Sequence, residues 1–129
     1  MKKEFSKKWN SSIQPRKQRK YLHNAPIHVR RSIMKCNLTK DLRKKFGVRN
    51  MTVRKGDTVK ILRGDFKGRT EKVEKVNRKD YKLYLSNVFN EKKDGTKVKY
   101  PVYYSNVRIT ELELSDKKRI PAKKEKVTK

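Results

Sequence analysis

The stretch from residue 53 to residue 76 constrains the fold more than any other part of the chain. Its sequence is VRKGDTVKILRGDFKGRTEKVEKV, and Val59 and Ile61 are spaced two apart, as on one face of a β-strand. A five-residue loop, GDFKG, follows, and Gly64 and Gly68 permit the positive φ angles of a tight turn. A second segment with spaced apolar residues completes the stretch. We therefore predict a β-hairpin with a short tip that is flanked by basic residues.

Apolar side chains occupy alternate positions in three segments that follow this hairpin, at residues 81–85, 98–102 and 107–109. Asp94-Gly95 precedes the second segment and is a strong signal for a hairpin turn. Pro101 cannot donate to a sheet ladder, so it predicts a strand at a sheet edge. Together with the hairpin, these segments make five short strands, a pattern that predicts a small barrel or sandwich.

The second strand of the hairpin breaks the alternation that a regular strand requires. Val73 and Val76 are three residues apart, so a regular strand would not turn both toward the core. One extra residue between them would restore a common face, and such bulges help small barrels to bend. We expect a β-bulge near Glu74 and Lys75.

The formal net charge of +26, from 39 Lys and Arg against 13 Asp and Glu, limits what the chain can bind. Such an excess destabilises a compact particle unless counter-charge is supplied, and nucleic acid is the expected source. The excess is uneven: residues 1–50 hold 16 basic and 2 acidic side chains, residues 51–116 hold 16 and 10, and residues 117–129 hold 7 and 1. We therefore expect a β domain at 51–116, a basic N-terminal arm and a Lys-rich C-terminal tail.

The first part of the arm, residues 1–22, has no periodicity, and its cations are interleaved with Phe5, Trp9 and Tyr21. These aromatic side chains either stack on unpaired bases while the cations contact phosphates, or fold back on the β domain. The charge of the arm favours contact with RNA.

A short helix is predicted over residues 27–34, with Asn24 as its cap and Pro26 in its first turn. Its basic residues lie off a narrow apolar stripe. We expect the apolar side to dock on the β domain and the basic side to face outward.

A second short helix is predicted between Thr39, which can cap it, and Gly47, which ends it. Leu38, Leu42 and Phe46 are spaced four apart and would form its apolar stripe. We expect it to dock in the same way as the first helix.

The sequence contains no recognisable catalytic or metal-binding constellation. The single Cys36 excludes an internal disulfide and a cysteine-based zinc cluster, and His23 and His28 have no partner set. Asp57 and Asp65 lie in turn contexts beside glycine, where a short carboxylate can hydrogen-bond its own backbone. No apolar run approaches the roughly 20 residues that span a bilayer. We expect an intracellular polyanion binder that is not an enzyme, holds no cofactor or metal and inserts into no membrane.

Residues 53–76 resemble a KOW motif, which a large-subunit ribosomal protein family shares with transcription elongation factors of the NusG type. The segments on either side of the motif favour the ribosomal family. An elongation factor would, in addition, need a separate polymerase-binding domain. Over residues 16–119 the chain is similar to the archaeal and eukaryotic branch of ribosomal protein family twenty-four, called twenty-six in eukaryotic cytosolic numbering. The segments that carry this similarity are HNAPIHVRRSIM (23–34), LTKDLRKKFGVRNM (38–51), DGTKV (94–98) and SNVRITELELSDKKR (105–119).

The resemblance implies a mainly β chain whose core is a five-stranded SH3-like barrel. It also implies a structural protein of the large ribosomal subunit in the cytoplasm, bound to the 5′ region of the large rRNA, active in early assembly and located near the peptide exit tunnel. Partners would be rRNA, neighbouring large-subunit proteins and factors that dock at the tunnel exit, with no homo-oligomer. The predicted rRNA contacts, from charge and from the resemblance, are Arg16, Lys17, Arg19, Lys20, His28, Arg30, Arg31, Arg49, Arg54, Lys55, Arg63, Lys67, Gly68, Arg69 and Arg78.

One residue departs from the motif, because Glu71 stands where glycine is usual. A carboxylate there adds bulk and negative charge to the second strand of the hairpin, which opposes close approach of RNA at that position. The alternative function is that of a KOW-domain regulator of transcription elongation or another RNA-binding regulator.

Overall fold

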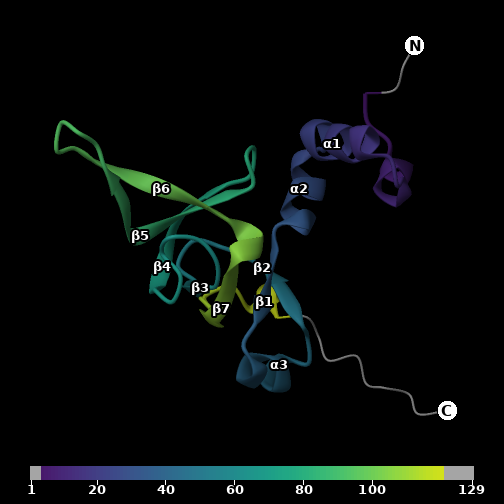
Figure 1. Ribbon diagram of the computed structural model, residues 1–129. Helices are drawn as coiled ribbons and strands as arrows, with labels where there is room; N and C mark the ends of the chain where they lie inside the picture. Colours follow the sequence, from purple (N-terminus) through teal and green to yellow (C-terminus); the bar gives the residue numbers. More distant parts are fainter. Residues whose placement is uncertain (1–3, 121–129) are drawn as a thin grey trace.

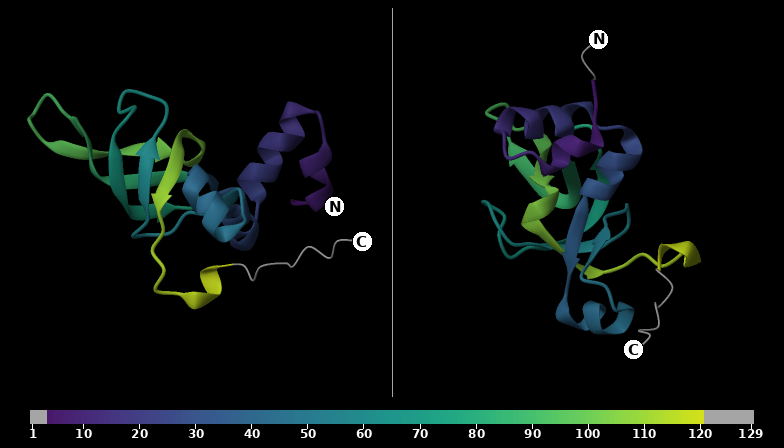
Figure 2. Two further views of the ribbon diagram at one scale, coloured as in Figure 1. Left: turned by 90° about the horizontal axis from the view of Figure 1, so that it is seen from below. Right: turned by 90° about the vertical axis from the view of Figure 1, so that its right-hand side faces the viewer.

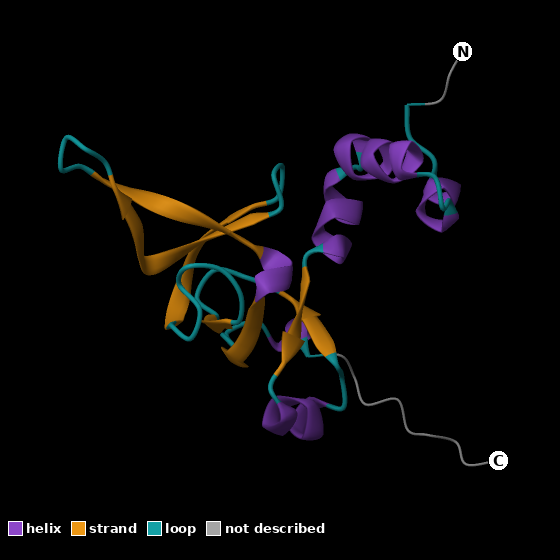
Figure 3. Cartoon of the chain, in the orientation of Figure 1, coloured by secondary structure: helices purple, strands orange, loops and turns teal. Residues whose placement is uncertain are grey.

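The computed structural model describes residues 4–120 as one seven-stranded sheet with helices at its periphery (Figure 1, Figure 3). The strands are β1 (Lys35–Leu38), β2 (Asn50–Thr52), β3 (Thr58–Ile61), β4 (Thr70–Asn77), β5 (Lys82–Glu91), β6 (Lys97–Tyr103) and β7 (Val107–Glu111). The α-helices are α1 (Pro15–Asn24), α2 (Ile27–Ile33) and α3 (Lys40–Phe46). Three short 3₁₀ helices are η1 (Lys7–Ser11), η2 (Tyr104–Asn106) and η3 (Lys117–Arg119).

The five predicted strands are β3 to β7, and two more extend them. The strand order is β2-β1-β7-β3-β4-β5-β6, in which β7 returns to pair with β3 while β3, β4, β5 and β6 form an antiparallel meander. Within residues 4–120 the ladders do not close into a barrel, since β6 and β2 remain the two edges. The fold is therefore a mixed arrangement of helices and a multistranded sheet, and the prediction of a mainly β chain was too narrow.

The local predictions for the β segments are confirmed. The register of β4 against β5 shifts between Val73 and Lys75, which is the expected bulge. Pro101 lies in β6, at the edge of the sheet. The β5–β6 hairpin turns at Gly95, whose φ is 80°, and it projects from one side of the sheet (Figure 1).

The core lies between the strands and is almost entirely aliphatic. Val59, Ile61, Leu83, Leu85 and Ile109 are each at most 1% exposed. Burying such side chains contributes about 1.5–3 kcal/mol each, which makes this cluster the main source of stability for the sheet.

Strand β1 lies within the arm, residues 1–50, for which the sequence predicted only helices, and β2 spans the predicted boundary between the arm and the β domain. β1 pairs in parallel with β7 and antiparallel with β2. Leu38 accordingly lies in β1 with its side chain fully buried, so its assignment to the apolar stripe of α3 was wrong. The bounds of α3 are as predicted: Thr39 occupies the cap position, although its side chain makes no capping hydrogen bond, and Gly47 ends the helix with a left-handed φ of 68°.

Residues 1–22 show no periodicity in the sequence, yet the structure contains η1 and α1 there. The Gln18 side-chain amide donates to three carbonyl oxygens of the η1 segment, at 2.6–3.2 Å, and so holds η1 against α1. The Phe5 and Tyr21 rings stack with centroids 5.3 Å apart. Phe5 and Trp9 therefore pack against side chains of α1. Figure 2 shows α1 and η1 projecting away from the strands.

The boundary between α1 and α2 also differs from the prediction. Asn24 is the last residue of α1, and Pro26 occupies the cap position of α2. The hydroxyl of Tyr81, in the β4–β5 turn, donates to the Leu22 carbonyl oxygen at 2.7 Å and fixes the end of α1 to the sheet.

A buried ion pair fastens the segment after β7 to the start of β3. Asp57 is 0% exposed, and its two carboxylate oxygens accept hydrogen bonds from the Arg119 guanidinium at 2.5 and 2.6 Å. The same carboxylate accepts from the backbone amides of Arg54 and Glu113, at 2.8 and 3.1 Å. Asp57 therefore has a structural role that the turn context only partly anticipated. The rest of the predicted Lys-rich tail, residues 121–129, lies outside the described residues.

Candidate nucleic-acid interface

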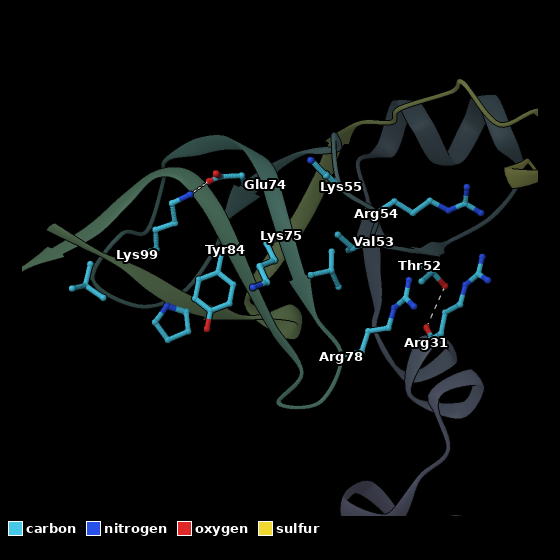
Figure 4. Close-up of a pocket in the computed structure, with 13 residues that line it drawn as sticks. Arg31, Thr52, Val53, Arg54, Lys55, Glu74, Lys75, Arg78, Tyr84 and Lys99 are labelled. Atoms are coloured by element: carbon cyan, nitrogen blue, oxygen red, sulfur yellow. Dashed lines mark hydrogen bonds and ion pairs between the residues drawn. The ribbon is translucent and has the colours of Figure 1, made fainter.

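An open groove of about 1200 Å³ lies between the C-terminal end of α2, the β2–β3 connection and the outer face of β4, β5 and β6 (Figure 4). Six of its lining residues are basic, and four of these belong to the predicted contact set. The basic lining residues are Arg31, Arg54, Lys55, Lys75, Arg78 and Lys99.

The floor of this groove is a row of side chains that runs across three strands. Lys75 of β4 lies directly opposite Tyr84 of β5, and Tyr84 lies opposite Pro101 of β6. Directly paired residues point to the same face of a sheet, so the three side chains are neighbours. Tyr84 is half-buried while Lys75 and Pro101 are exposed, which leaves an apolar platform open to solvent.

Two of the six cations have acidic partners. Lys99 pairs with Glu74, and Arg54 donates to Asp116 at 2.8 Å. The hydrogen bond from Arg54 lowers the pKa of the Asp116 carboxyl below its ordinary value. The other four basic residues are exposed and form no salt bridge within residues 4–120; they are Arg31, Lys55, Lys75 and Arg78.

Arg78 connects the groove to two smaller concavities along α2. One contains Arg30 and Lys79, and the other contains His28 and Arg31. The structure therefore gathers His28, Arg30, Arg31, Arg54, Lys55 and Arg78 around one continuous basic surface, although they come from three separate segments of the sequence.

Arg30 differs from the other members because its guanidinium is used within the chain. Its N–H groups donate to the carbonyl oxygens of His23, Ala25 and Lys79 at 2.5–2.8 Å, and its guanidinium lies 5.8 Å from the centre of the Tyr81 ring. Three of its five donors are thereby committed. Arg30 joins α1 and α2 to the β4–β5 turn, a role that no sequence pattern revealed.

The predicted loop contacts lie elsewhere, at the tip between β3 and β4. Arg63, Lys67, Gly68 and Arg69 are exposed there. The tip is braced by Phe66, whose ring lies 5.1 Å from the Tyr100 ring and 5.1 Å from the Arg69 guanidinium. The loop is thus a rigid basic tip, but its residues do not line the groove.

The remaining predicted contacts are exposed and distributed. Arg16, Lys17, Arg19 and Lys20 lie on α1, which projects from the sheet, and Arg49 immediately precedes β2. The Lys20 ammonium lies 5.0 Å from the Trp9 ring centre. None of these five predicted contacts lines the groove.

Glu71 has a partner within the sheet. Its carboxylate accepts a hydrogen bond from the Asn87 side-chain amide at 3.0 Å. This hydrogen bond joins β4 to β5 at a point before the bulge in β4. It gives a structural reason for a glutamate at the position where the motif usually has glycine.

The sequence missed Lys75, Tyr84 and Lys99 as functional candidates. The alternation of apolar residues over 81–85 implies an outward position for Tyr84, but only the pairing of β4, β5 and β6 places it between Lys75 and Pro101. The available signal was an aromatic residue at an outward-facing strand position.

Other kinds of site receive no support from residues 4–120. They contain no group of three or more His, Cys, Asp or Glu side chains that could hold a metal ion. None of the helices there combines the length and apolar character that a bilayer crossing needs. Cys36 is buried, and burial raises the pKa of its thiol to about 12.

A sheet with exposed arginines and lysines around a partly apolar groove, in a chain of net charge +26, is typical of a nucleic-acid-binding protein. Comparison with known proteins narrows this class. Residues 12–126 match the family that comprises ribosomal protein L26 of eukaryotes and its archaeal counterpart, L24. The chain belongs to this family of large-subunit ribosomal proteins, which are structural components and not enzymes.

One curated relative shows how close the similarity is. The chain is 49% identical over 108 residues to the large ribosomal subunit protein uL24 of Methanosarcina barkeri (strain Fusaro). The aligned part covers 84% of this chain and 93% of the relative.

Proposed function

We propose that this protein is a structural constituent of the large subunit of the cytoplasmic ribosome and binds the 5′ region of the large rRNA. It acts early in subunit assembly and lies near the peptide exit tunnel, where it is close to docking factors. Its partners are rRNA and neighbouring ribosomal proteins. Within the sheet, β3 to β7 form the SH3-like unit, and the sharp bend expected of such a unit falls at the bulge in β4.

The observation that carries this proposal is the clustering of exposed cations without salt-bridge partners around the one groove between α2, the β2–β3 connection and the sheet. Arg31, Lys55, Lys75 and Arg78 have no salt-bridge partner within the described part of the chain. Phosphates supply the counter-charge that these groups and the net charge of +26 require. The rigid tip at the β3–β4 loop then fixes the orientation of the protein on the RNA.

The binding mode is tested by the salt dependence of affinity for large-subunit rRNA. If about ten phosphates are neutralised, log K falls against log salt with a slope of roughly 0.7–0.9 per contact. A slope near zero would exclude a phosphate clamp. Sedimentation of cell extracts in high salt gives the second measurement, because a structural constituent stays with large subunits whereas an elongation regulator is released.

The role of the loop tip is tested by a matched pair of charge reversals. Lys67→Glu with Arg69→Glu should weaken rRNA binding more than Lys124→Glu with Lys126→Glu, which lies in the tail outside the described residues. The pairs remove the same charge, so equal losses would mean that the tip contributes only to a diffuse positive field.

A further inference from the structure

The groove is lined by an aromatic ring and by aliphatic side chains, which phosphate binding alone does not explain. Tyr84 lies between Lys75 and Pro101 in the cross-strand row, and Val53, Val76 and Val98 also line the groove. Val98 is 44% exposed, so it presents aliphatic surface to solvent within the groove. The floor therefore suits a ligand with both a flat apolar face and negative charge.

Basic side chains lie both beside Tyr84 and at the far end of the groove. Lys75 is the immediate cross-strand neighbour of Tyr84, and Figure 4 shows their side chains next to each other. Arg78 and Arg31 lie toward α2, at the other end of the groove (Figure 4). A flat group on Tyr84 would consequently have Lys75 beside it and further cations along the groove.

We propose that this groove binds unpaired nucleotides of the rRNA, with a base stacked on Tyr84 and the adjoining phosphates held by Lys75 and Arg78. The inference rests on the proposed function, and it names the part of the RNA that this surface takes. Aromatic side chains stack on any base because each base has a π face, while neighbouring cations follow the backbone.

The position of Tyr84 on the groove floor favours unpaired nucleotides over an RNA duplex, and the size of the groove favours more than one nucleotide. An A-form helix keeps its bases stacked inside and presents 2′-hydroxyls and phosphates, so it cannot lay a base on Tyr84. The volume of about 1200 Å³ exceeds the roughly 300–1,000 Å³ of small-molecule sites, which leaves room for more than one nucleotide.

The test measures binding of the full chain to three probes: a ten-residue oligouridylate, an A-form RNA duplex of ten base pairs, and a ten-residue polyglutamate. Tyr84→Ala should weaken binding to the oligouridylate about 5- to 150-fold, the range expected for loss of one stacked base. Tyr84→Phe, which keeps the ring, should bind as the wild type does. Affinity for the duplex should be the same for all three proteins.

A second readout applies if Tyr84→Ala fails to fold. In a Trp9→Phe background, Tyr84→Trp places the single tryptophan of the chain on the groove floor. Stacking of a base should quench its fluorescence on addition of the oligouridylate, and addition of the duplex should not.

Any one of three results would overturn the proposal. Tyr84→Ala and the wild type could bind the oligouridylate with equal affinity, or the fluorescence of the Tyr84→Trp variant could remain unquenched. The third is an affinity for polyglutamate that depends on Tyr84 and matches the affinity for RNA. If the wild-type chain still binds large-subunit rRNA with a steep salt slope, such a result removes only the groove assignment. Loss of rRNA binding by the wild-type chain would instead remove the proposed function itself.

Discussion

Replacement of Arg119 by methionine removes the partner of a fully buried carboxylate. The side chains of Asp57 and Arg119 are 0% and 2% exposed, so solvent does not screen their interaction. In Arg119→Met the carboxylate keeps its two backbone amide donors but loses both guanidinium donors. Methionine has a similar length and fills the space without supplying a donor.

The expected loss is large because a charge is left buried without its partner. Breaking a buried ion pair in this way costs about 3–5 kcal/mol. A domain of this size is stable by about 5–15 kcal/mol, so the variant loses a large share of its stability. With a urea m-value of about 2 kcal/mol/M, the unfolding midpoint should fall by about 2 M.

Urea unfolding followed by circular dichroism measures this change. Lys118→Met is the matched control, because it removes an exposed charge from the same short helix and should leave the midpoint almost unchanged. The double variant Asp57→Asn with Arg119→Met should recover part of the loss, because it no longer buries an unpaired charge. A midpoint for Arg119→Met equal to that of Lys118→Met would refute the structural role of the ion pair.

Contacts within the chain support three further predictions. Gly56→Ala should destabilise the protein by at least about 1 kcal/mol in urea unfolding, because Gly56 has a φ of 94° and a Cβ would lie 3.3 Å from Glu113 Cγ. Gly95→Ala is the control for the φ effect, because its Cβ would meet no atom within 4 Å. An equal loss of stability in both variants would mean that the contact with Glu113 does not matter. Arg30→Lys keeps the charge but not the three hydrogen bonds, so it should raise the rate of amide hydrogen exchange in α1. The control, Arg31→Lys, should leave this rate unchanged. An unchanged rate in Arg30→Lys would show that Arg30 does not hold the helix. Burial raises the pKa of Cys36 to about 12, so its thiol should resist alkylation in the folded chain at about pH 8. The free energy of unfolding should fall as pH rises from about 9 toward 12, because the unfolded chain releases this proton first. Rapid alkylation under native conditions would contradict the buried position.

The sequence alone determined those features whose causes lie within a few residues. The β3–β4 hairpin follows from alternation around a glycine-bracketed loop, and the bulge follows from the three-residue spacing of Val73 and Val76. The C-terminal end of α3 follows from Gly47, and the edge position of β6 from Pro101. In each case the local chemistry leaves the backbone few alternatives.

The tertiary structure decided the features that depend on distant partners. β1 and β2 are short and form because β1 pairs with β7, far along the chain, with Asn37 opposite Arg108. Arg119 belonged to a stretch that looked like a basic tail, and only folding brings it to Asp57, 62 residues away in the sequence. The groove likewise combines α2, the β2–β3 connection and three strands, so no linear pattern contains it. Contacts between distant residues form only when the core aligns the strands, which is why charge and spacing predicted a basic RNA-binding chain but not the surface that gathers its cations.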